Sequence, residues 1–158
     1  MSDKLNVRKA AEKDIPAIVS IYKNCVLKTN IKFYPPTVIK EWIESISKEN
    51  ILNQFKNTKW VVCEKDKKIA GFVQYSLQEG TLFQIQVEPK SQGTGIGSAL
   101  YRYVEEDFVR SGLEKISLNA TLNAVPFYEK MGFSKLKNIQ FKLKKTLVEM
   151  IKMEKIFC

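Results

Sequence analysis

The sequence predicts an α/β or α+β domain, in which a mixed, mostly antiparallel sheet carries helices on its faces. Apolar residues make up 44% of the 158 residues and aromatic residues 11%, which is enough for a packed core. Segments with helical apolar spacing alternate with β-rich runs in the order β-α-α-β-β-β-α-β-α-β-β. The length fits one domain over residues 1–158, and no internal repeat or Pro/Gly/Ser-rich linker marks a boundary.

Up to residue 47 the sequence predicts one strand and two helices. A short β run over residues 5–8 comes first. Asp14 is placed to cap a helix or to lie in its first turn, and Pro16 is tolerated just inside it. Apolar residues then follow at helical spacing, namely Ile15, Ile18, Val19, Tyr22 and Val26. Residues 31–36 break this helix, and a second helix is expected over about 37–47.

Three β runs joined by short polar turns come next, and they predict an antiparallel meander. They cover residues 60–64, 69–77 and 81–87. A Gly-rich segment leads into a helix over about 95–111, which has an apolar stripe and ends naturally at Gly112. The remaining chain is predicted as a strand, a short helix and two strands, over residues 115–118, 125–131, 133–139 and 147–157.

The charge of the chain is basic, +9 from 26 Lys and Arg against 17 Asp and Glu. Such a surface attracts polyanions, so the partner could be nucleic acid or a small ligand with several phosphates. Alternatively, the scattered lysines only keep the protein soluble. A nucleic-acid-binding module is disfavoured, because no Lys/Arg stripe is interleaved with aromatic residues.

Residue counts exclude several kinds of site and mechanism. The chain has no histidine, so it supplies no histidine base, nucleophile or metal ligand. Its three cysteines are widely spaced and form no Cys-x-x-Cys pair, so we expect no metal and no redox pair. The start lacks the apolar core of a signal peptide, and no apolar run approaches the roughly 20 residues that span a bilayer. We therefore expect a cytoplasmic protein with reduced thiols and no membrane partner.

The most informative motif lies between the residue 81–87 strand and the next helix. The strand ends in Val87-Glu88-Pro89, and the helix opens with Gln92-Gly93-Thr94-Gly95-Ile96-Gly97-Ser98. Glycines let a phosphate approach the backbone, and the first N–H groups of a helix are unpaired and attract anions. A Walker loop would need Gly-Lys-Ser/Thr, and the dinucleotide fingerprint would need its third glycine elsewhere. A tight strand-to-helix turn with no ligand is the structural alternative.

Two signatures resemble those of the GNAT acetyltransferase superfamily. Gln92-x-x-Gly95-x-Gly97, directly after Val87-x-Pro89, resembles its acetyl-CoA signature. The stretch from Ala124 through Phe127-Tyr128 to Gly132-Phe133 resembles its second signature. Residues 7–16 and 153–155 look like its first and last strands, so the resemblance covers nearly the whole chain. It implies the GNAT acyl-CoA N-acyltransferase fold, with helices on both faces of the sheet.

The resemblance also implies acetyl-CoA as co-substrate, no metal, and acetyl transfer to a primary amine by direct attack in a ternary complex. The acceptor would be a small molecule or a protein. In this family the fourth and fifth strands splay apart, and the pantetheine arm lies between them beside Ile85, Gln86 and Val87. Residues 92–98 would bind the pyrophosphate, and a backbone N–H near Val87 would be the oxyanion donor.

Tyr128 matches the general acid of the family. A phenol is protonated at pH 7 and can donate to a leaving thiolate. The structural alternative is an aromatic on a buried helix face, like its neighbour Phe127. Many members carry an asparagine seven residues earlier, where this chain has Thr121 between Asn119 and Asn123. Asn123 could take over its hydrogen bond to the coenzyme or cap the following helix.

The general base is left open by the sequence. The fourth strand carries Gln84 and Gln86, and a glutamine cannot take a proton, although it can orient a water. Glu79 and Glu88 are nearby carboxylates that also suit solvated turns. We expect proton removal through ordered water.

The amine acceptor is expected opposite the coenzyme, past the turn after the first helix. Phe33, Tyr34 and Trp42 are candidates for its entrance, with core packing the alternative for Trp42. A non-catalytic acyl-CoA sensor is the alternative function. A homodimer paired through the C-terminal strand is left open.

Overall fold

A computed structural model describes residues 4–157, and its centre is a seven-stranded sheet with the order β1-β2-β3-β4-β5-β7-β6. All neighbouring strands are antiparallel except β4 and β5, which are parallel. The mixed, mostly antiparallel sheet and the β2-β3-β4 meander are therefore confirmed. The strands are β1 (Leu5–Lys9), β2 (Lys59–Lys65), β3 (Lys68–Ser76), β4 (Thr81–Val87), β5 (Lys115–Thr121), β6 (Ser134–Lys142) and β7 (Leu147–Ile156).

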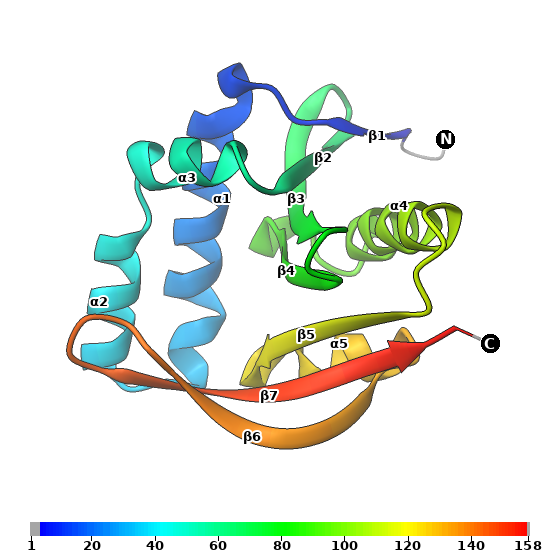
Figure 1. Ribbon diagram of the computed structural model, residues 1–158. Coiled ribbons are helices and arrows are strands. Elements are labelled where there is room, and N and C mark those ends of the chain that lie inside the picture. The colour runs from blue at the N-terminus through cyan, green and yellow to red at the C-terminus, as the bar shows by residue number, and fades with distance from the viewer. Residues whose placement is uncertain (1–3, 158) are drawn as a thin grey trace.

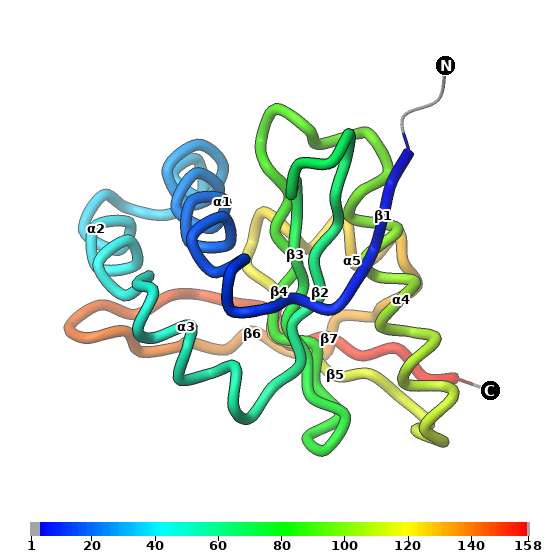
Figure 2. Tube along the Cα trace, turned by 90° about the horizontal axis from the view of Figure 1, so that it is seen from above, coloured from blue at the N-terminus to red at the C-terminus, as the bar shows by residue number. Residues whose placement is uncertain are grey.

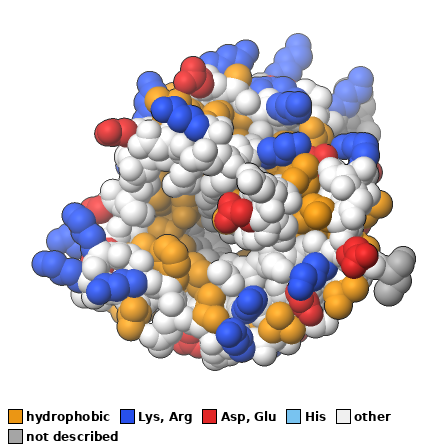
Figure 3. All heavy atoms as spheres, in the orientation of Figure 1, with side chains coloured by type: hydrophobic (Ala, Val, Ile, Leu, Met, Phe, Trp, Pro, Cys, Tyr) orange, Lys and Arg blue, Asp and Glu red, His pale blue; other side chains and the backbone are white. Residues whose placement is uncertain are grey.

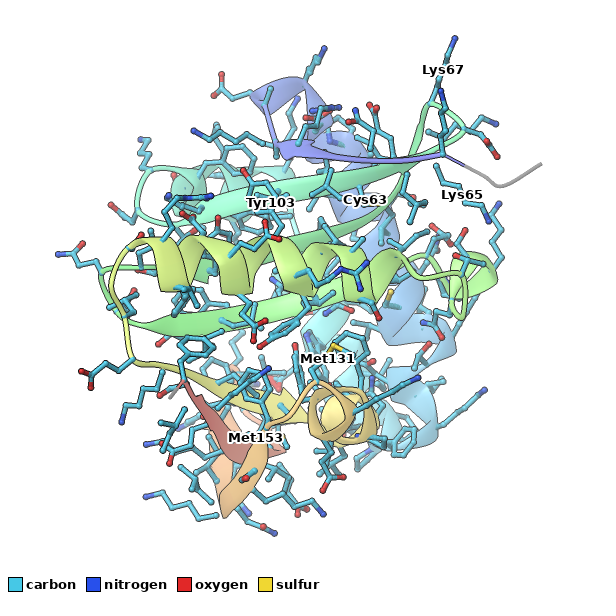
Figure 4. All side chains as sticks on the ribbon, turned by 90° about the vertical axis from the view of Figure 1, so that its right-hand side faces the viewer. Cys63, Lys65, Lys67, Tyr103, Met131 and Met153 are labelled. Carbon is cyan, nitrogen blue, oxygen red and sulfur yellow. The ribbon has the colours of Figure 1, made fainter. Side chains whose placement is uncertain are left out.

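Helices cover both faces of the sheet, as Figures 1 and 2 show. One hydrophobic cluster joins one face to α4 and α5, and a second joins the other face to α1, α2 and α3. Figure 4 shows α4 crossing its face of the sheet, with Met131 at the end of α5 below it. The helices are α1 (Ile15–Lys28), α2 (Pro36–Ser45), α3 (Lys48–Phe55), α4 (Ile96–Arg110) and α5 (Val125–Lys130).

Helix α3 is the one α-helix that the sequence analysis did not predict. The second predicted helix ends at Ser45, and Ile46 is extended before the chain turns into α3. Ser47 caps the new helix by accepting a hydrogen bond from the Asn50 N–H at 3.1 Å. Ile51, Leu52 and Phe55 of α3 pack against the second hydrophobic cluster. The helix has only eight residues, which is shorter than the window that a periodicity argument needs.

The parallel pair β4 and β5 separates along its length, which sets the position of the site. The two strands pair only at Thr81 and Ser117, where the Ser117 N–H donates to the Gly80 carbonyl at 3.0 Å. Beyond this point they diverge (Figure 1). Within residues 4–157, the second half of β4 therefore has a strand partner on the β3 side alone.

Among the described helices, none has both the length and the apolar character that crossing a membrane requires.

Candidate functional site

The Gly-rich segment forms a loop whose conformation depends on glycine. Gly93 and Gly95 have φ values of 79° and 88°, a region that residues with a Cβ rarely adopt. Gly95 is the N-cap of α4, and no side chain of the described residues caps this helix. No acidic residue lies in the first turn of α4. The first N–H groups of a 15-residue helix are thus left for an anion.

A cavity of about 420 Å³ opens beside this loop, and we call it the loop cavity. Most residues predicted to bind a coenzyme line it, together with Cys25 and residues of α5. The predicted residues that line it are Ile85, Gln86, Val87, Gln92, Gly93, Gly95, Ile96, Gly97, Ser98, Asn123 and Tyr128. Two others lie elsewhere. The Thr94 hydroxyl donates to the Ser91 carbonyl at 2.5 Å, and Asn119 lines a different cavity.

The backbone of β4 presents polar groups to the gap beside β5. The Glu88 N–H donates across to the Ala70 carbonyl of the β3 side at 2.8 Å. Alternate residues of an antiparallel strand bond to the same neighbour. Because Glu88 bonds to the β3 side, the N–H and C=O groups of Ile85 and Val87 point away from β3, into the gap. There the Val87 carbonyl accepts a hydrogen bond from the Cys25 thiol at 3.1 Å. Burial raises the pKa of this thiol to about 12, which keeps it protonated.

Tyr128 lies on α5 next to the same gap, and 4% of its surface is exposed. Burial raises the pKa of its hydroxyl, and a hydrogen bond with the Ile85 backbone lowers it by less. Edge contacts with Phe127 and Phe133, at 5.4 and 5.7 Å between ring centres, hold the ring in place.

A larger cavity of about 670 Å³ adjoins the loop cavity at β4, and we call it the hairpin cavity. Its walls come from α2, α3, β4 and the β6–β7 hairpin, and Figure 3 shows the hollow between helices and hairpin on this face. Glu41 of α2 fixes the hairpin tip, because its carboxylate accepts from the N–H groups of Lys145 and Thr146 at 2.6 and 2.8 Å. The Thr146 side chain, and then the N–H groups of Lys145 and Thr146, lower the pKa of Glu41.

The two cavities meet at Tyr128. They share five lining residues, which are Ile85, Gln86, Asn123, Ala124 and Tyr128. Among residues 4–157, no group pairs with the Asn123 Oδ1, although this oxygen is buried. A buried acceptor without a partner is costly unless a ligand supplies the donor. Ligands in the two cavities would therefore approach each other beside Tyr128 and Asn123.

The three residues proposed for the acceptor entrance separate in the structure. Trp42 is packed in the core at 5% exposure and also lines the hairpin cavity, so its contact with an acceptor stays a prediction. Tyr34 is buried outside both cavities, where its hydroxyl donates to the Glu149 carbonyl at 2.5 Å. Phe33 is half exposed and lines neither cavity.

The carboxylates considered as bases also lie away from the place beside Tyr128 where the two cavities meet, which we call the junction. Glu79 and Glu88 line neither cavity, and Glu88 accepts from the Asn24 amide at 3.2 Å. The acidic residues that do line the hairpin cavity are Glu41 and Glu44, and Glu41 is engaged with the hairpin. Within the described residues, no group of three His, Cys, Asp or Glu side chains could hold a metal ion.

The sequence analysis missed two polar residues, Gln74 and Gln54, which lie behind the point where the two cavities meet. Gln74 is 5% exposed, and its amide bonds Gln54 of α3 at 3.0 Å and Gln84 of β4 at 2.9 Å. A glutamine inside a β-rich run that is otherwise apolar was the available signal, because a buried amide needs partners.

Comparisons with known proteins agree on one family. The family described as "Acetyltransferase (GNAT) domain" matches residues 30–157. The peptidyl-lysine N-acetyltransferase YiaC of Escherichia coli (strain K12) is 31% identical over 130 residues, which cover 80% of this chain and 82% of that protein.

Solved structures with low sequence identity share the fold. A GCN5-related N-acetyltransferase from Rhodopseudomonas palustris has a TM-score of 0.92 at 14% identity, covering 99% of this chain and 98% of that one. The PaiA N-acetyltransferase of Thermoplasma acidophilum, in complex with coenzyme A, has a TM-score of 0.81 at 22% identity, covering 98% and 99%.

Proposed function

The chain belongs to the GNAT acetyltransferase family, and from this premise we propose that it transfers an acetyl group from acetyl-CoA to a primary amine. The observation that carries the proposal is the meeting of two cavities at one buried tyrosine. A reaction between two bound substrates needs two sites that open onto one point. The loop cavity suits acetyl-CoA, and the hairpin cavity suits the amine.

Features of the loop cavity support acetyl-CoA as its ligand. The uncapped N-terminus of α4 and the side-chain-free backbone at Gly93 and Gly95 would hold a pyrophosphate through N–H groups. The backbone groups of Ile85 and Val87 that face away from β3, above all the Val87 N–H, would pair with the amides of a pantetheine arm, as a missing strand would. The orphan oxygen of Asn123 would accept from such an amide. The Thermoplasma acidophilum protein, which shares the fold, was solved in complex with coenzyme A.

Acetyl-CoA would supply the acetyl group in activated form, as a thioester. The Val87 N–H faces the gap and would donate to the thioester oxygen as negative charge develops there. Tyr128 would give its hydroxyl proton to the sulfur as the C–S bond breaks. The ammonium ion would first lose one proton to water in the hairpin cavity, and the amine nitrogen would then form the new C–N bond with its lone pair. A second proton would leave the nitrogen after attack and return through water to the Tyr128 oxygen, which restores the phenol. One proton is released for each ammonium ion acetylated.

The amine acceptor is the least specified part of the proposal. YiaC is named a peptidyl-lysine N-acetyltransferase, so a lysine side chain of a peptide is the first acceptor to test. A small-molecule amine would also fit a cavity of about 670 Å³. We place the reaction in the cytoplasm, consistent with free thiols at Cys25 and Cys63.

A non-catalytic acyl-CoA sensor is the second candidate. It is favoured by the position of Glu79 and Glu88 outside both cavities, which leaves the junction without either predicted base. The two functions are separated by a panel of lysine peptides and small amines incubated with acetyl-CoA, with release of free thiol as the readout. Amine-dependent thiol release is expected. Tight acetyl-CoA binding with no release above the amine-free rate for any amine would favour the sensor.

A further inference from the structure

A chain of hydrogen-bonded glutamine amides runs through the wall of the hairpin cavity and ends at the junction. The Gln86 Nε2 donates to the Gln84 Oε1 at 3.1 Å, and the Gln84 Nε2 donates to the Gln74 Oε1 at 2.9 Å. The Gln74 Nε2 then donates to the Gln54 Oε1 at 3.0 Å and to the Thr58 hydroxyl oxygen at 3.2 Å. The chain thus crosses from β4 through β3 to α3 and the loop behind it.

The direction of this chain is set at its far end by Thr58. The Thr58 hydroxyl donates its single proton to the Gln54 backbone carbonyl at 2.7 Å. Toward Gln74 it therefore offers only lone pairs, and Gln74 must turn its NH₂ group to it. The carbonyl oxygen of Gln74 then faces Gln84, so Gln84 must donate to it from its own NH₂ group. The carbonyl oxygen of Gln84 therefore faces Gln86, and Gln86 must donate to it from its NH₂ group.

The Gln86 carbonyl oxygen is the free end of the chain. The Gln86 NH₂ group is turned to Gln84, and no donor within residues 4–157 bonds the Gln86 Oε1. Gln86 lines both cavities, together with Tyr128. A hydrogen-bond acceptor with a fixed direction is thus available where the two cavities meet.

We infer that the Gln86 Oε1 accepts an N–H of the attacking amine and so directs the amine lone pair, and that Gln84, Gln74 and Thr58 are positioning residues that hold this oxygen in place. The inference rests on the proposed function and extends it to the recognition of the acceptor. It assigns the Gln86 side chain to the amine, whereas the sequence analysis assigned the residue to the coenzyme.

An amide in this position has a consequence for the pH dependence. Glutamine accepts a hydrogen bond but cannot remove a proton. The amine must therefore lose its proton to water, and kcat/KM should keep rising with pH toward the pKa of the amine, about 10.4 for a free lysine side chain. Gln86→Glu has the same shape but can take a proton, so it should move the rising limb to lower pH.

The direct test compares Gln86→Met and Gln86→Glu with the wild type on the best amine of the panel. Loss of one ordinary hydrogen bond corresponds to about a three- to tenfold fall in kcat/KM for the amine. We expect this fall in Gln86→Met, with the KM for acetyl-CoA within about twofold of wild type. An unchanged amine kcat/KM, or an equal loss for acetyl-CoA, would overturn the inference.

Thr58 offers a matched pair of variants that touches neither substrate. Thr58→Val keeps the shape but removes the lone pairs that orient Gln74, whereas Thr58→Ser keeps the hydroxyl. Thr58→Val should raise the amine KM about threefold at constant KM for acetyl-CoA, and Thr58→Ser should restore it. Equal effects of the two variants would contradict the positioning role. A wild type that acetylates no amine would overturn the proposed function instead, and the inference with it.

Discussion

The loop cavity and the hairpin cavity differ in how the sequence encodes them. The loop cavity is built mainly from two short stretches, residues 85–98 and 123–131, and its shape depends on backbone conformation. The hairpin cavity draws residues from Tyr22 to Met150 and depends on side chains that meet only in the folded chain. A contiguous motif therefore predicts one cavity, and the tertiary structure determines the other.

The reaction point where the cavities meet should show the largest effect. Tyr128→Phe removes the proton donor and keeps the ring contacts, so kcat should fall by about 10²–10⁴-fold, with the Kd for acetyl-CoA within about twofold. Steady-state kinetics and calorimetry measure the two quantities. Tyr101→Phe is the matched control, because Tyr101 is 2% exposed and donates to Glu105 at 3.0 Å outside both cavities. Comparable kcat losses in both variants would remove Tyr128 from the chemistry.

The loop cavity should be sensitive to negative charge. Gly95→Glu places a carboxylate at an anion site, so acetyl-CoA affinity should fall by about a hundredfold or more, roughly 2.7 kcal/mol. Gly112→Glu, at the opposite end of α4, controls for backbone strain, because φ is +80° there against +88° at Gly95 and an added Cβ meets nothing within 4 Å at either position. If both variants weaken binding equally, strain and not charge is the cause.

The hairpin cavity should respond to acid through Glu41. The Thr146 side chain and the hairpin N–H groups lower the pKa of Glu41, so its contribution to holding the hairpin is present above the ordinary glutamate pKa of about 4.3. The contribution is lost as the pH falls through the lowered value. NMR amide shifts of Lys145 and Thr146 should titrate below pH 4.3, while Gly93 and Gly95 stay unchanged. Glu41→Gln should abolish the titration, and its persistence would assign it to another group.

The fold was largely predictable from the sequence. Six of the seven described strands, and the helices on both faces of the sheet, follow from local apolar spacing and turns. The seventh strand, β1, follows from a short N-terminal β run. Helix α3 was missed because its eight residues are fewer than a periodicity argument needs. Because α3 was not predicted, its residue Gln54 was not recognised as the hydrogen-bond partner of Gln74. The sequence also does not give the direction of a side chain: the Thr94 hydroxyl bonds the Ser91 carbonyl, and Asn119 lines the hairpin cavity. Their contacts with a coenzyme stay predictions.

The central claim is that acetyl donor and amine meet beside Tyr128, the donor in the loop cavity and the amine in the hairpin cavity. It is tested most directly by a crystal structure with a bisubstrate analogue, in which coenzyme A is joined through an acetyl bridge to a lysine side chain. The account predicts the diphosphate on residues 92–98, the bridge beside Tyr128 and Gln86, and the lysine arm in the hairpin cavity. A diphosphate bound elsewhere, or both arms confined to one cavity, would contradict it.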